Sequence, residues 1–326
     1  MLNDLTLLAS IADGEFYSGE ELGERLGVTR SAIWKALKRL GELGLEIEAV
    51  AGRGYRLTTP LELLSSERIS AHWGDAEKSI EQIEILHEVD STNRHVLARA
   101  SSAQKPIACL AERQTAGRGR RGRQWLSPFG CNIYLSLGWP FPRGVVGLEG
   151  VSLAVALAVV RALSDFGIED LGVKWPNDIY WKKKKLAGVL LELTGEAGGG
   201  CFVVVGVGIN VRMPVASGQL IDQAWTDVSH AKAGYSISRN EIAGRLLHHL
   251  VRTLQQFDQH GWPSFASEWR QRDLASGHLV NVQCFDELIQ GTALGVDGAG
   301  ALLVETDTGV RRLHAGDVSL RLRSVN

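Results

Sequence analysis

A short basic stretch of the chain combines the residue types that bind anions. Residues 111–125 read AERQTAGRGRRGRQW, and three glycines and four arginines lie between Gly117 and Arg123. Glycine allows positive φ and a close approach of the backbone to a ligand. Arginine offers a planar, permanently charged fork to phosphates and carboxylates. The composition therefore predicts a loop that closes over an anion.

The context of this stretch argues against a merely solvated basic loop, which is the alternative for an arbitrary arginine-glycine sequence. Apolar runs at 107–111 and 131–137 flank it, and each is typical of a buried strand. The stretch also matches G-x-G-x-x-G, but a dinucleotide fingerprint must open a helix and precede an acid by about 20 residues. Pro128 and Gly130 follow at once and favour no helix, and a Walker loop is also absent.

Three further motifs follow in chain order: KWPND at 174–178, KLAG at 185–188 and GVGIN at 206–210. Together with GRGRRGRQW at 117–125, they resemble the biotin protein ligases. The N-terminal segment narrows the resemblance to the bifunctional members, which also repress the biotin operon. The resemblance covers nearly the whole chain and is highly specific, because several motifs occur in the family's order. It implies a central domain similar to class II aminoacyl-tRNA synthetases and a C-terminal SH3-like β-barrel.

The resemblance also implies a reaction of two acyl transfers. The carboxylate of biotin attacks the α-phosphate of ATP, which yields biotinyl-5′-AMP and pyrophosphate. A lysine of the biotin carboxyl carrier protein of acetyl-CoA carboxylase then attacks the mixed anhydride and releases AMP. ATP and Mg²⁺ are the implied cofactors, biotin is a substrate, and no tightly bound metal is expected. Only about one unperturbed lysine in 2,500 is neutral at pH 7, so the site must position, deprotonate or desolvate the amine.

Matching this sequence to the family's motifs assigns residues to each ligand. The residues expected at biotin are Ser91, Thr92, Asn93, Gln114, Gly117, Arg118, Gly119, Arg120 and Lys185. Those expected at ATP and the adenylate are Arg120, Arg121, Trp125, Asn177, Lys185 and Asn210. The expected catalytic residues are Lys185, Arg118, Arg120 and Asp178.

The resemblance also implies individual roles. Lys185 would hold the biotin carboxylate and the α-phosphate together, and it is the lysine of 182–185 expected to point inward, since it adjoins apolar residues. Arg118 and Arg120 would face the carboxylate and the phosphates. Trp125 is expected to pack on adenine, and Asn210 is expected on the adenine side. Asn177 and Asp178 are the expected Mg²⁺ ligands, or Asp178 assists the acceptor lysine; the sequence does not separate these roles.

The pocket for the ureido ring of biotin is expected where a strand meets a helix. Ser91 and Thr92 follow the strand-like residues 83–86 and precede a helix expected at 93–100. Hydroxyls at a helix N-terminus, with its free N–H groups, form a polar pocket. A simple helix cap by Asp90 or Ser91 fits equally well, and the resemblance decides for biotin.

Residues 1–60 are expected to form a winged helix-turn-helix domain. A capping box at 18–21 opens a short helix, and Thr29 can cap the next one. That next helix would bury apolar residues spaced i, i+4 and i+7, and two short helices joined in this way fit a helix-turn-helix. Residues 45–50 and 52–57 alternate like two strands of a wing, with Arg53 at its tip.

Charge within this domain favours DNA as its partner. Residues 28–57 contain six Lys and Arg against three acids, whereas residues 1–27 contain one Arg against six acids. Positive charge on the second helix and the wing suits phosphate contacts. The alternative is a winged helix used only for protein contacts. The residues expected to contact operator DNA are Thr29, Arg30, Ser31, Trp34, Lys35, Lys38 and Arg53.

The rest of the chain predicts two further domains joined to the first by a linker at 58–67. Residues 66–270 are expected to be α+β, with a central, largely antiparallel mixed sheet, helices on one side and a core helix at 151–166. A second capping box lies at 238–241. In 273–326, short β-like runs separated by Gly and Asp turns suggest a small closed β-barrel.

Composition limits the remaining possibilities. A chain of 326 residues, 44% hydrophobic and 22% charged, is typical of a folded soluble protein of two or three domains. The net charge of −2 does not by itself indicate nucleic-acid binding. Four cysteines without a C-x-x-C motif predict reduced thiols in a cytoplasmic protein and make a zinc site improbable. No signal peptide is visible, and the apolar run 151–160 is too short to span a membrane.

Two other classes of function compete with the bifunctional reading. A biotin-sensing repressor without ligase activity is disfavoured by Lys185, Arg120 and the 174–178 motif, which are intact. A lipoate or octanoate ligase is disfavoured by the 117–125 loop. The resemblance further implies a homodimer that forms when biotinyl-AMP is bound and that represses biotin genes.

Overall fold

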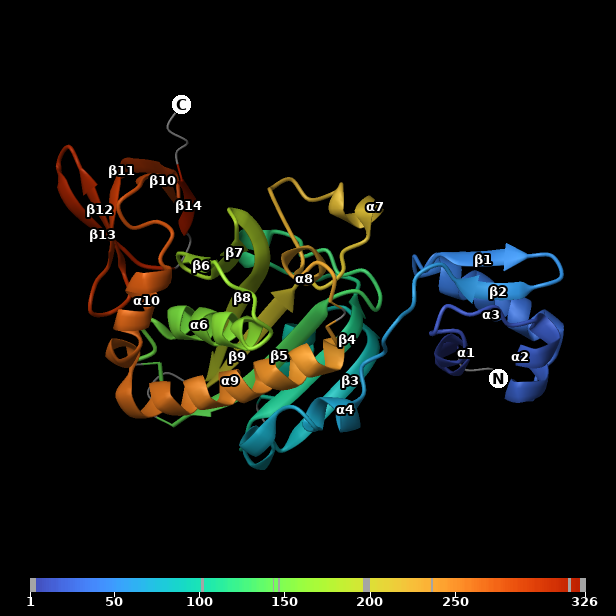
Figure 1. The fold of residues 1–326 in the computed structure, drawn as a ribbon. Helices are drawn as coiled ribbons and strands as arrows, with labels where there is room; N and C mark the ends of the chain where they lie inside the picture. Colours follow the sequence, from blue (N-terminus) through green and yellow to red (C-terminus); the bar gives the residue numbers. More distant parts are fainter. Residues whose placement is uncertain are drawn as a thin grey trace.

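The structure, a computed structural model, describes residues 4–100, 103–142, 144–145, 147–195, 200–235, 237–315 and 318–322. Three parts follow one another along the chain: an N-terminal helical unit, a central sheet with helices, and a C-terminal sheet (Figure 1). The N-terminal unit and the C-terminal sheet lie at opposite ends of the molecule (Figure 1). Within the described ranges, no helix is both long enough and apolar enough to cross a membrane.

The N-terminal unit is a helix-turn-helix with a two-stranded wing, as predicted. Its elements are α1 (Asp4–Ser10), α2 (Gly19–Leu26), α3 (Arg30–Glu42), β1 (Ile47–Val50) and β2 (Gly54–Leu57). The Ser18 hydroxyl accepts the Glu21 N–H at 3.0 Å, and the Thr29 hydroxyl accepts the Ala32 N–H at 3.3 Å. Both predicted caps are confirmed. Gly23 lets α2 approach the turn, because a Cβ there would lie 2.7 Å from the Val28 carbonyl oxygen.

The central sheet has seven strands in the order β3-β4-β5-β9-β8-β7-β6. The strands are β3 (Gln82–Val89), β4 (Ile107–Gln114), β5 (Ile133–Phe141), β6 (Leu171–Lys174), β7 (Asp178–Trp181), β8 (Lys184–Gly195) and β9 (Cys201–Ile209). Only β3 and β4 run parallel among these described pairs. The prediction of a largely antiparallel mixed sheet is confirmed.

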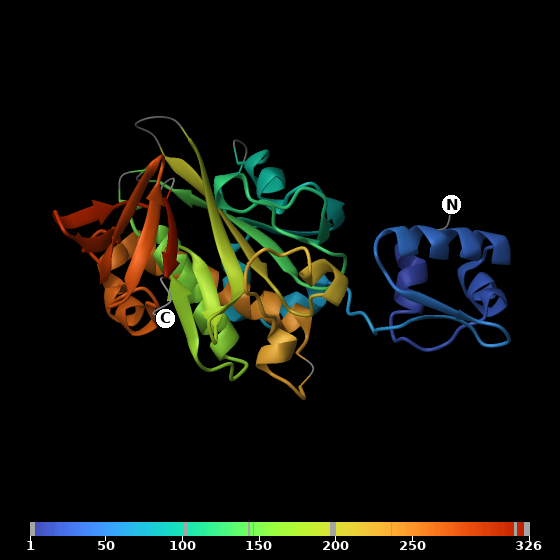
Figure 2. The same ribbon diagram turned by 90° about the horizontal axis from the view of Figure 1, so that it is seen from above.

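Helices cover both faces of this sheet, so the prediction of helices on one side was wrong. Helices α6 (Val151–Ser164) and α9 (Arg239–His260) share one core with the sheet, whereas α5 (Thr92–Leu97) packs through Val96 on the opposite face (Figure 2). There Val96 contacts a cluster that includes Cys109 and Phe202. Strands β4 and β9 are apolar at consecutive positions, so each face needs a cover.

The remaining helices are short and connect these layers. They are α4 (Ser66–Ser70), η1 (Gly74–Ser79), η2 (Arg120–Gly122), α7 (Val215–Gly218), α8 (Val228–Ala231), η3 (Trp262–Ser264) and α10 (Ala266–Arg272). The second predicted capping box is confirmed, because the Ser238 hydroxyl accepts the Glu241 N–H at 3.2 Å. All four cysteines are free. Residues 196–199, between β8 and β9, lie outside the described residues.

The C-terminal part is an antiparallel sheet in the order β13-β12-β11-β10-β14. Its strands are β10 (Leu279–Cys284), β11 (Glu287–Val296), β12 (Leu302–Thr306), β13 (Gly309–Leu313) and β14 (Val318–Leu322). Apolar residues of this sheet, such as Val282 and Ile289, join the core of the central part. The described ladders run from β13 to β14, and no pairing of these two edge strands closes them into a barrel.

Candidate active site

One cavity collects nearly all of the residues predicted to bind biotin and ATP. It encloses about 1030 Å³, including space open to solvent, and lies between the central sheet, the 117–125 loop and the end of β14. The predicted residues that line it are Ser91, Thr92, Asn93, Gln114, Arg118, Gly119, Arg120, Arg121, Trp125, Asn177, Asp178 and Lys185. Gly117 and Asn210 do not line it.

A buried hydrogen-bond network forms the polar end of the cavity. The Thr92 N–H and hydroxyl donate to Gln114 Oε1 at 2.9 and 3.1 Å, and Gln114 Nε2 donates to the Ser127 hydroxyl at 3.1 Å. Ser91 occupies the N-cap position of α5, but its side chain makes no capping hydrogen bond. The alternative that Ser91 merely caps the helix is therefore wrong. These buried hydroxyls and amides can recognise a ligand with both donors and acceptors.

The basic loop folds back on itself, as its glycines predict. Arg121 and Gly122 have positive φ, at 57° and 70°, around the short helix η2. Gly117 has a structural reason to be glycine, because a Cβ there would lie 2.5 Å from the Trp125 carbonyl oxygen. Its own carbonyl accepts the Trp125 N–H at 2.9 Å. Gly117 thus closes the base of the loop and does not reach the cavity.

The two arginines predicted to face anions are held by different partners. Both Glu192 carboxylate oxygens lie 3.0 Å from Arg118 Nη2, and Glu192 also accepts from Asn93 Nδ2 at 2.8 Å. Arg120 Nη1 donates to Asn177 Oδ1 at 3.3 Å, and Nη2 donates to the Ala315 carbonyl next to the C-terminal sheet. Glu192 was not predicted, although its place four residues after Gly188 on the same strand puts both on one face and was a usable signal.

Trp125 packs on the sheet at the positions where glycines leave room. A Cβ on Gly208 would lie 2.4 Å from Trp125 Cε2, and one on Gly188 would lie 3.2 Å from Cζ3. The glycines of the GVGIN motif therefore admit protein side chains, because Gly206 makes room for Asn93 in the same way. The Trp125 indole N–H is buried and has no hydrogen-bond partner in the structure.

Asn210, predicted on the adenine side, is buried and does not line the cavity. It is 3% exposed, and its Nδ2 donates to the Thr226 carbonyl at 3.0 Å. Its N–H donates to the Leu186 carbonyl at 3.0 Å. Asn210 therefore ties β9 to residues 223–226, which run beside Lys185. The GVGIN motif ends within the core because its last side chain bonds to this segment.

An ion pair lies on the wall of the cavity. Lys185 Nζ lies 2.8 Å from Asp178 Oδ1, and the two side chains are 13% and 17% exposed. Lys185 points inward, as the adjoining apolar residues predict. Its N–H donates to the Ala224 carbonyl, and its carbonyl accepts the Thr226 N–H, both at 2.9 Å. The 223–226 segment was not predicted to border the site, and nothing in its composition indicates that it does.

Lys174 is a second lysine of the cavity to which sequence analysis gave no role, although it opens the KWPND motif. Its Nζ donates to the Tyr180 hydroxyl at 2.8 Å and lies 4.8 Å from the centre of the ring. Burial lowers the pKa of Lys174, and the nearby Asp178 carboxylate opposes that shift. Burial also raises the pKa of Tyr180 to about 12.

The oxygens available to a metal ion are few. In the described part of the chain, no group of three or more His, Cys, Asp and Glu side chains could hold one. Asp178 and Asn177 lie in the cavity, but each already has a cationic partner, Lys185 or Arg120. Mg²⁺ commonly takes one or two protein ligands and completes its shell with water and substrate phosphates. Asn177 and Asp178 fit that partial role and no more.

The predicted DNA-binding residues form an exposed face of the N-terminal unit. All seven of them, Thr29, Arg30, Ser31, Trp34, Lys35, Lys38 and Arg53, are exposed. The Trp34 side chain is 55% exposed and lies among these polar and cationic residues of α3. Arg53 lies 4.0 Å from the centre of the Phe16 ring, which steadies the tip of the wing.

Comparisons with known proteins agree with this arrangement along the whole chain. The family described as biotin/lipoate A/B protein ligase matches residues 86–210, an HTH domain matches residues 3–56, and the biotin protein ligase C-terminal domain matches residues 276–321. "Bifunctional ligase/repressor BirA" of Salmonella typhimurium is 39% identical over 97% of both chains. The protein of that name from Bacillus subtilis is 32% identical over 97% of this chain and 98% of its own.

A solved structure gives the same result for the central and C-terminal parts. The biotin protein ligase from Aquifex aeolicus in complex with biotin and ATP is 30% identical and has a TM-score of 0.64. It covers 74% of this chain and 100% of its own. The bifunctional relatives thus cover 97% of this chain, and the solved biotin protein ligase covers 74% of it. The chain belongs to the family of bifunctional biotin protein ligases and repressors.

Proposed function

We propose that this protein activates biotin with ATP to biotinyl-5′-AMP and transfers biotin to a lysine of the biotin carboxyl carrier protein. The observation that carries this proposal is the Lys185–Asp178 pair, which faces the cavity. Ser91, Thr92 and Gln114 bound one end of this cavity, and the 117–125 loop covers it. The polar end suits the ureido ring of biotin, and the cations suit its carboxylate and the phosphates of ATP.

In the first step, a carboxylate oxygen of biotin attacks the α-phosphorus, and the bond to pyrophosphate breaks. Both reacting groups are negatively charged, so they approach only where cations offset their repulsion. Lys185 supplies one such cation when its ammonium exchanges Asp178 for the ligand oxygens. Arg118 and Arg120 supply two more from the loop, with Arg121 beside them. Trp125 lies next to Lys185, at 5.4 Å from Nζ to the ring centre, and would wall the reacting centre.

In the second step, the ε-amine of the acceptor lysine attacks the carbonyl carbon, and AMP leaves with the bridging oxygen. Asp178, once Lys185 binds the ligand, can accept the proton that the amine loses. Asn177 would orient the phosphate through Arg120. In the alternative role of Asp178, it and Asn177 would hold Mg²⁺, whose charge would offset that of the phosphates.

We also propose that the adenylate-bound protein is a homodimer that represses transcription of the biotin biosynthesis operon. The exposed Trp34 and the basic residues of α3 and the wing support a DNA contact. The proposed modules are 1–60 for DNA, 66–270 for catalysis and 273–326 as a C-terminal domain. The finer resemblances, to class II aminoacyl-tRNA synthetases and to an SH3-like domain, are part of this proposal; the closed barrel expected from the sequence is not, because the described strands form an open sheet.

One assay tests the enzymatic half. The protein is incubated with ATP, Mg²⁺, biotin and a biotin carboxyl carrier domain, and the acceptor is weighed by mass spectrometry. We expect the mass gain of one biotin and release of pyrophosphate. An acceptor that gains no mass, with or without release of pyrophosphate, would indicate a sensor without ligase activity. Tighter binding of lipoate than of biotin in a competition assay would indicate the lipoate-type alternative.

A gel shift tests the repressor half. Operator DNA should bind more tightly with biotin plus ATP than with biotin alone, because only a ligand that favours the dimer can strengthen DNA binding. Removal of residues 1–60 should abolish this binding and leave adenylation measurable. Equal operator affinity with and without the adenylate would refute a corepressor role.

A further inference from the structure

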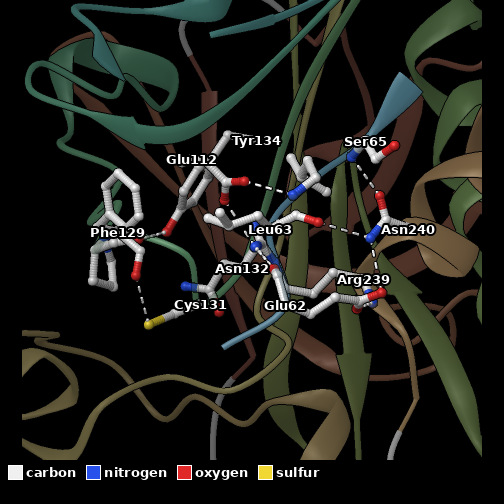
Figure 3. A network of polar contacts seen from close by, with 12 residues as sticks. Glu62, Leu63, Ser65, Glu112, Phe129, Cys131, Asn132, Tyr134, Arg239 and Asn240 are labelled. Carbon is white, nitrogen blue, oxygen red and sulfur yellow. Dashed lines mark hydrogen bonds and ion pairs between the residues drawn. The ribbon is translucent and has the colours of Figure 1, made fainter. Parts of the chain in front are cut away.

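The linker between the N-terminal unit and the central part borders a deeply buried ion pair. Residues 58–65 connect β2 to α4. Beside them, Arg239 at the start of α9 lies 2.8 Å from Glu112 on β4 (Figure 3). These two side chains are 6% and 1% exposed. Two charges removed from water to this degree are stable only if their other hydrogen-bonding groups are also satisfied.

The linker backbone provides part of that satisfaction. The Leu64 N–H donates to Glu112 Oε1 at 2.6 Å, and Arg239 Nη1 donates to the Glu62 carbonyl at 2.7 Å (Figure 3). The Asn132 carbonyl accepts from Arg239 Nε and Nη2 at 3.1 and 2.8 Å. If the linker left, both members of the ion pair would lose a partner in the interior. The pair and the docked linker therefore depend on each other.

A second set of contacts holds the same segment. Asn240 Oδ1 accepts the Ser65 N–H at 2.7 Å, and Nδ2 donates to the Leu63 carbonyl at 3.0 Å. The Glu62 carboxylate accepts from the Ser238 hydroxyl and the Arg239 N–H, both at 2.6 Å. Burial disfavours the ionised form of Glu62, but these hydrogen bonds outweigh it and lower the pKa of its carboxyl. Residues 62–65 are thus bound to the central part along their length.

The N-terminal unit holds the linker residue that precedes Glu62. The Leu61 N–H donates to the Ala12 carbonyl at 2.8 Å, and Leu61 packs against the core of the N-terminal unit. Phe129, which comes from the central part and is 3% exposed, belongs to that same core. Leu61 is therefore bonded to the N-terminal unit, and the next residue, Glu62, is bonded to the central part. No residue separates these two, and the Leu63 side chain also packs against the N-terminal core.

We propose that Glu112 and Arg239 are positioning residues for DNA binding: they dock residues 62–65 and so hold the winged helix in one orientation. This proposal rests on the repressor half of the proposed function. The two winged helices of a dimer must meet two half-sites at a set distance. An orientation fixed in advance removes an ordering cost that a freely hinged domain incurs when it binds.

An insertion tests the orientation without touching the ion pair. Gly-Ser-Gly-Ser is inserted between Leu61 and Glu62, where the hydrogen bond of Leu61 to the N-terminal unit and those of residues 62–65 to the central part can persist. We expect the operator affinity of the biotinyl-AMP-bound protein to fall tenfold or more at unchanged adenylation rate and dimerisation. The matched control is the same insertion between Asp307 and Thr308, in the exposed turn between β12 and β13, and it should change nothing. Wild-type operator affinity in the Leu61–Glu62 insertion would overturn the proposal.

A substitution tests the ion pair itself. Glu112→Gln keeps an acceptor for the Leu64 N–H but removes the charge beside Arg239. We expect a glutamate-specific protease to cleave after Glu62 at least tenfold faster than in wild type, together with a loss of operator affinity. The control is Glu88→Gln, which removes an exposed glutamate on β3. Unchanged cleavage and operator affinity in Glu112→Gln would overturn the role of the pair.

The two readouts separate this proposal from the one on which it rests. If the wild-type protein bound no operator under any ligand, the repressor half of the proposed function would fail, and the protease rates would still decide whether the pair docks the linker. If Glu112→Gln did not fold, the insertion variant would decide on orientation, because its ion pair is intact.

Discussion

Two buried ion pairs, one at the linker and one in the cavity, use similar chemistry under different surroundings. In the first, the Arg239 guanidinium is surrounded by a carboxylate and the carbonyls of Glu62 and Asn132. In the second, Lys185 meets Asp178 on the wall of a cavity, with more of both side chains exposed. One pair has its hydrogen-bonding capacity filled by the protein, and the other faces space that a ligand can fill.

The difference indicates what each pair is for. A pair enclosed by backbone carbonyls cannot exchange partners without unfolding its surroundings, so it serves position. A pair on a cavity wall can exchange Asp178 for an incoming anion at little structural cost, so it serves chemistry. Substitutions at the linker pair should therefore act on stability and DNA binding, whereas substitutions at the cavity pair should act on turnover.

The largest expected effect is on stability, from Glu112→Ala. This change leaves the Arg239 charge buried without its carboxylate, and breaking a buried pair in this way costs about 3–5 kcal/mol. Thermal unfolding of the full chain, followed by circular dichroism, should show a clearly lower Tm. Asp178→Ala is the matched variant and should lower Tm much less, since water in the cavity can solvate Lys185. Similar losses from both changes would erase the distinction between the pairs.

The next effect is on catalysis, from Lys185→Ala. Removing one preorganised donor to developing charge commonly costs about 10²- to 10³-fold in rate, and we expect this loss in adenylation. Transfer from supplied biotinyl-AMP should fall less, because the phosphate is already bonded and the attacking group is an amine. Pyrophosphate release and acceptor labelling measure the two steps. Lys184→Ala, at the exposed neighbouring lysine, is the control.

Equal losses in both steps would contradict this assignment. They would mean that Lys185 only binds the adenylate or supports the fold, and the cavity pair would then resemble the linker pair in being structural.

Both members of the cavity pair were predicted as site residues, although not as an ion pair, whereas neither member of the linker pair was predicted, for a physical reason. Lys185 is recognisable because it adjoins apolar residues within one local motif. Glu112 and Arg239 are 127 residues apart, and nothing local marks either as buried. The capping box at Ser238 correctly predicted the start of α9, but not that Arg239 would turn into the core. Contacts between distant segments depend on how layers stack, which local spacing does not encode.

The same limit explains the other differences. The caps of α2, α3 and α9 and the strands were predictable, because each depends on neighbouring residues. The second helical layer, which α5 forms on the opposite face of the sheet, was not predicted, since it follows from strands that are apolar on both faces. Asn210 was expected beside adenine because glycines precede it, yet those glycines make room for Trp125 and Asn93.

A smaller effect is expected from Arg120→Gly, which tests whether the loop retains the adenylate. Arg120 bonds to Asn177 and to the Ala315 carbonyl, so it links the loop to both sides of the cavity. Losing a charge-assisted hydrogen bond costs about 1.5–3 kcal/mol, or roughly ten- to a hundredfold in the off-rate of biotinyl-AMP. The escaped anhydride should label serum albumin, which mass spectrometry can detect. Arg121→Gly, the control, removes the same charge from the exposed next residue and should release less adenylate than Arg120→Gly does.

If Arg120→Gly retained the adenylate as long as wild type and labelled only the acceptor, Arg120 would not be a retaining contact. The loop would then close over biotin alone, and the phosphate side of the cavity would belong to Lys185.

The smallest effect is expected at Lys174, a partly buried cation hydrogen-bonded to a hydroxyl and so intermediate between the two pairs. Burial lowers the pKa of Lys174 below its ordinary 10.5. Between the folded-state pKa and 10.5, the unfolded chain binds more protons, so this group makes wild-type stability rise with pH in that window. Below the folded-state pKa, the cost of the buried charge is present in full.

Lys174→Met should therefore raise Tm at neutral pH, and this gain should shrink as the pH rises toward the ordinary lysine value. The measurement must end below about pH 10, where unfolded tyrosines begin to ionise, because Tyr180 then acts in the opposite direction. Lys184→Met, on the exposed side of the neighbouring hairpin, controls for loss of charge. A variant at position 174 that is less stable than wild type at neutral pH would mean that the ammonium is stabilised by Asp178 and Tyr180. Lys174 would then resemble the linker pair in having its charge stabilised by protein groups, and the cavity would contain a structural cation in addition to Lys185.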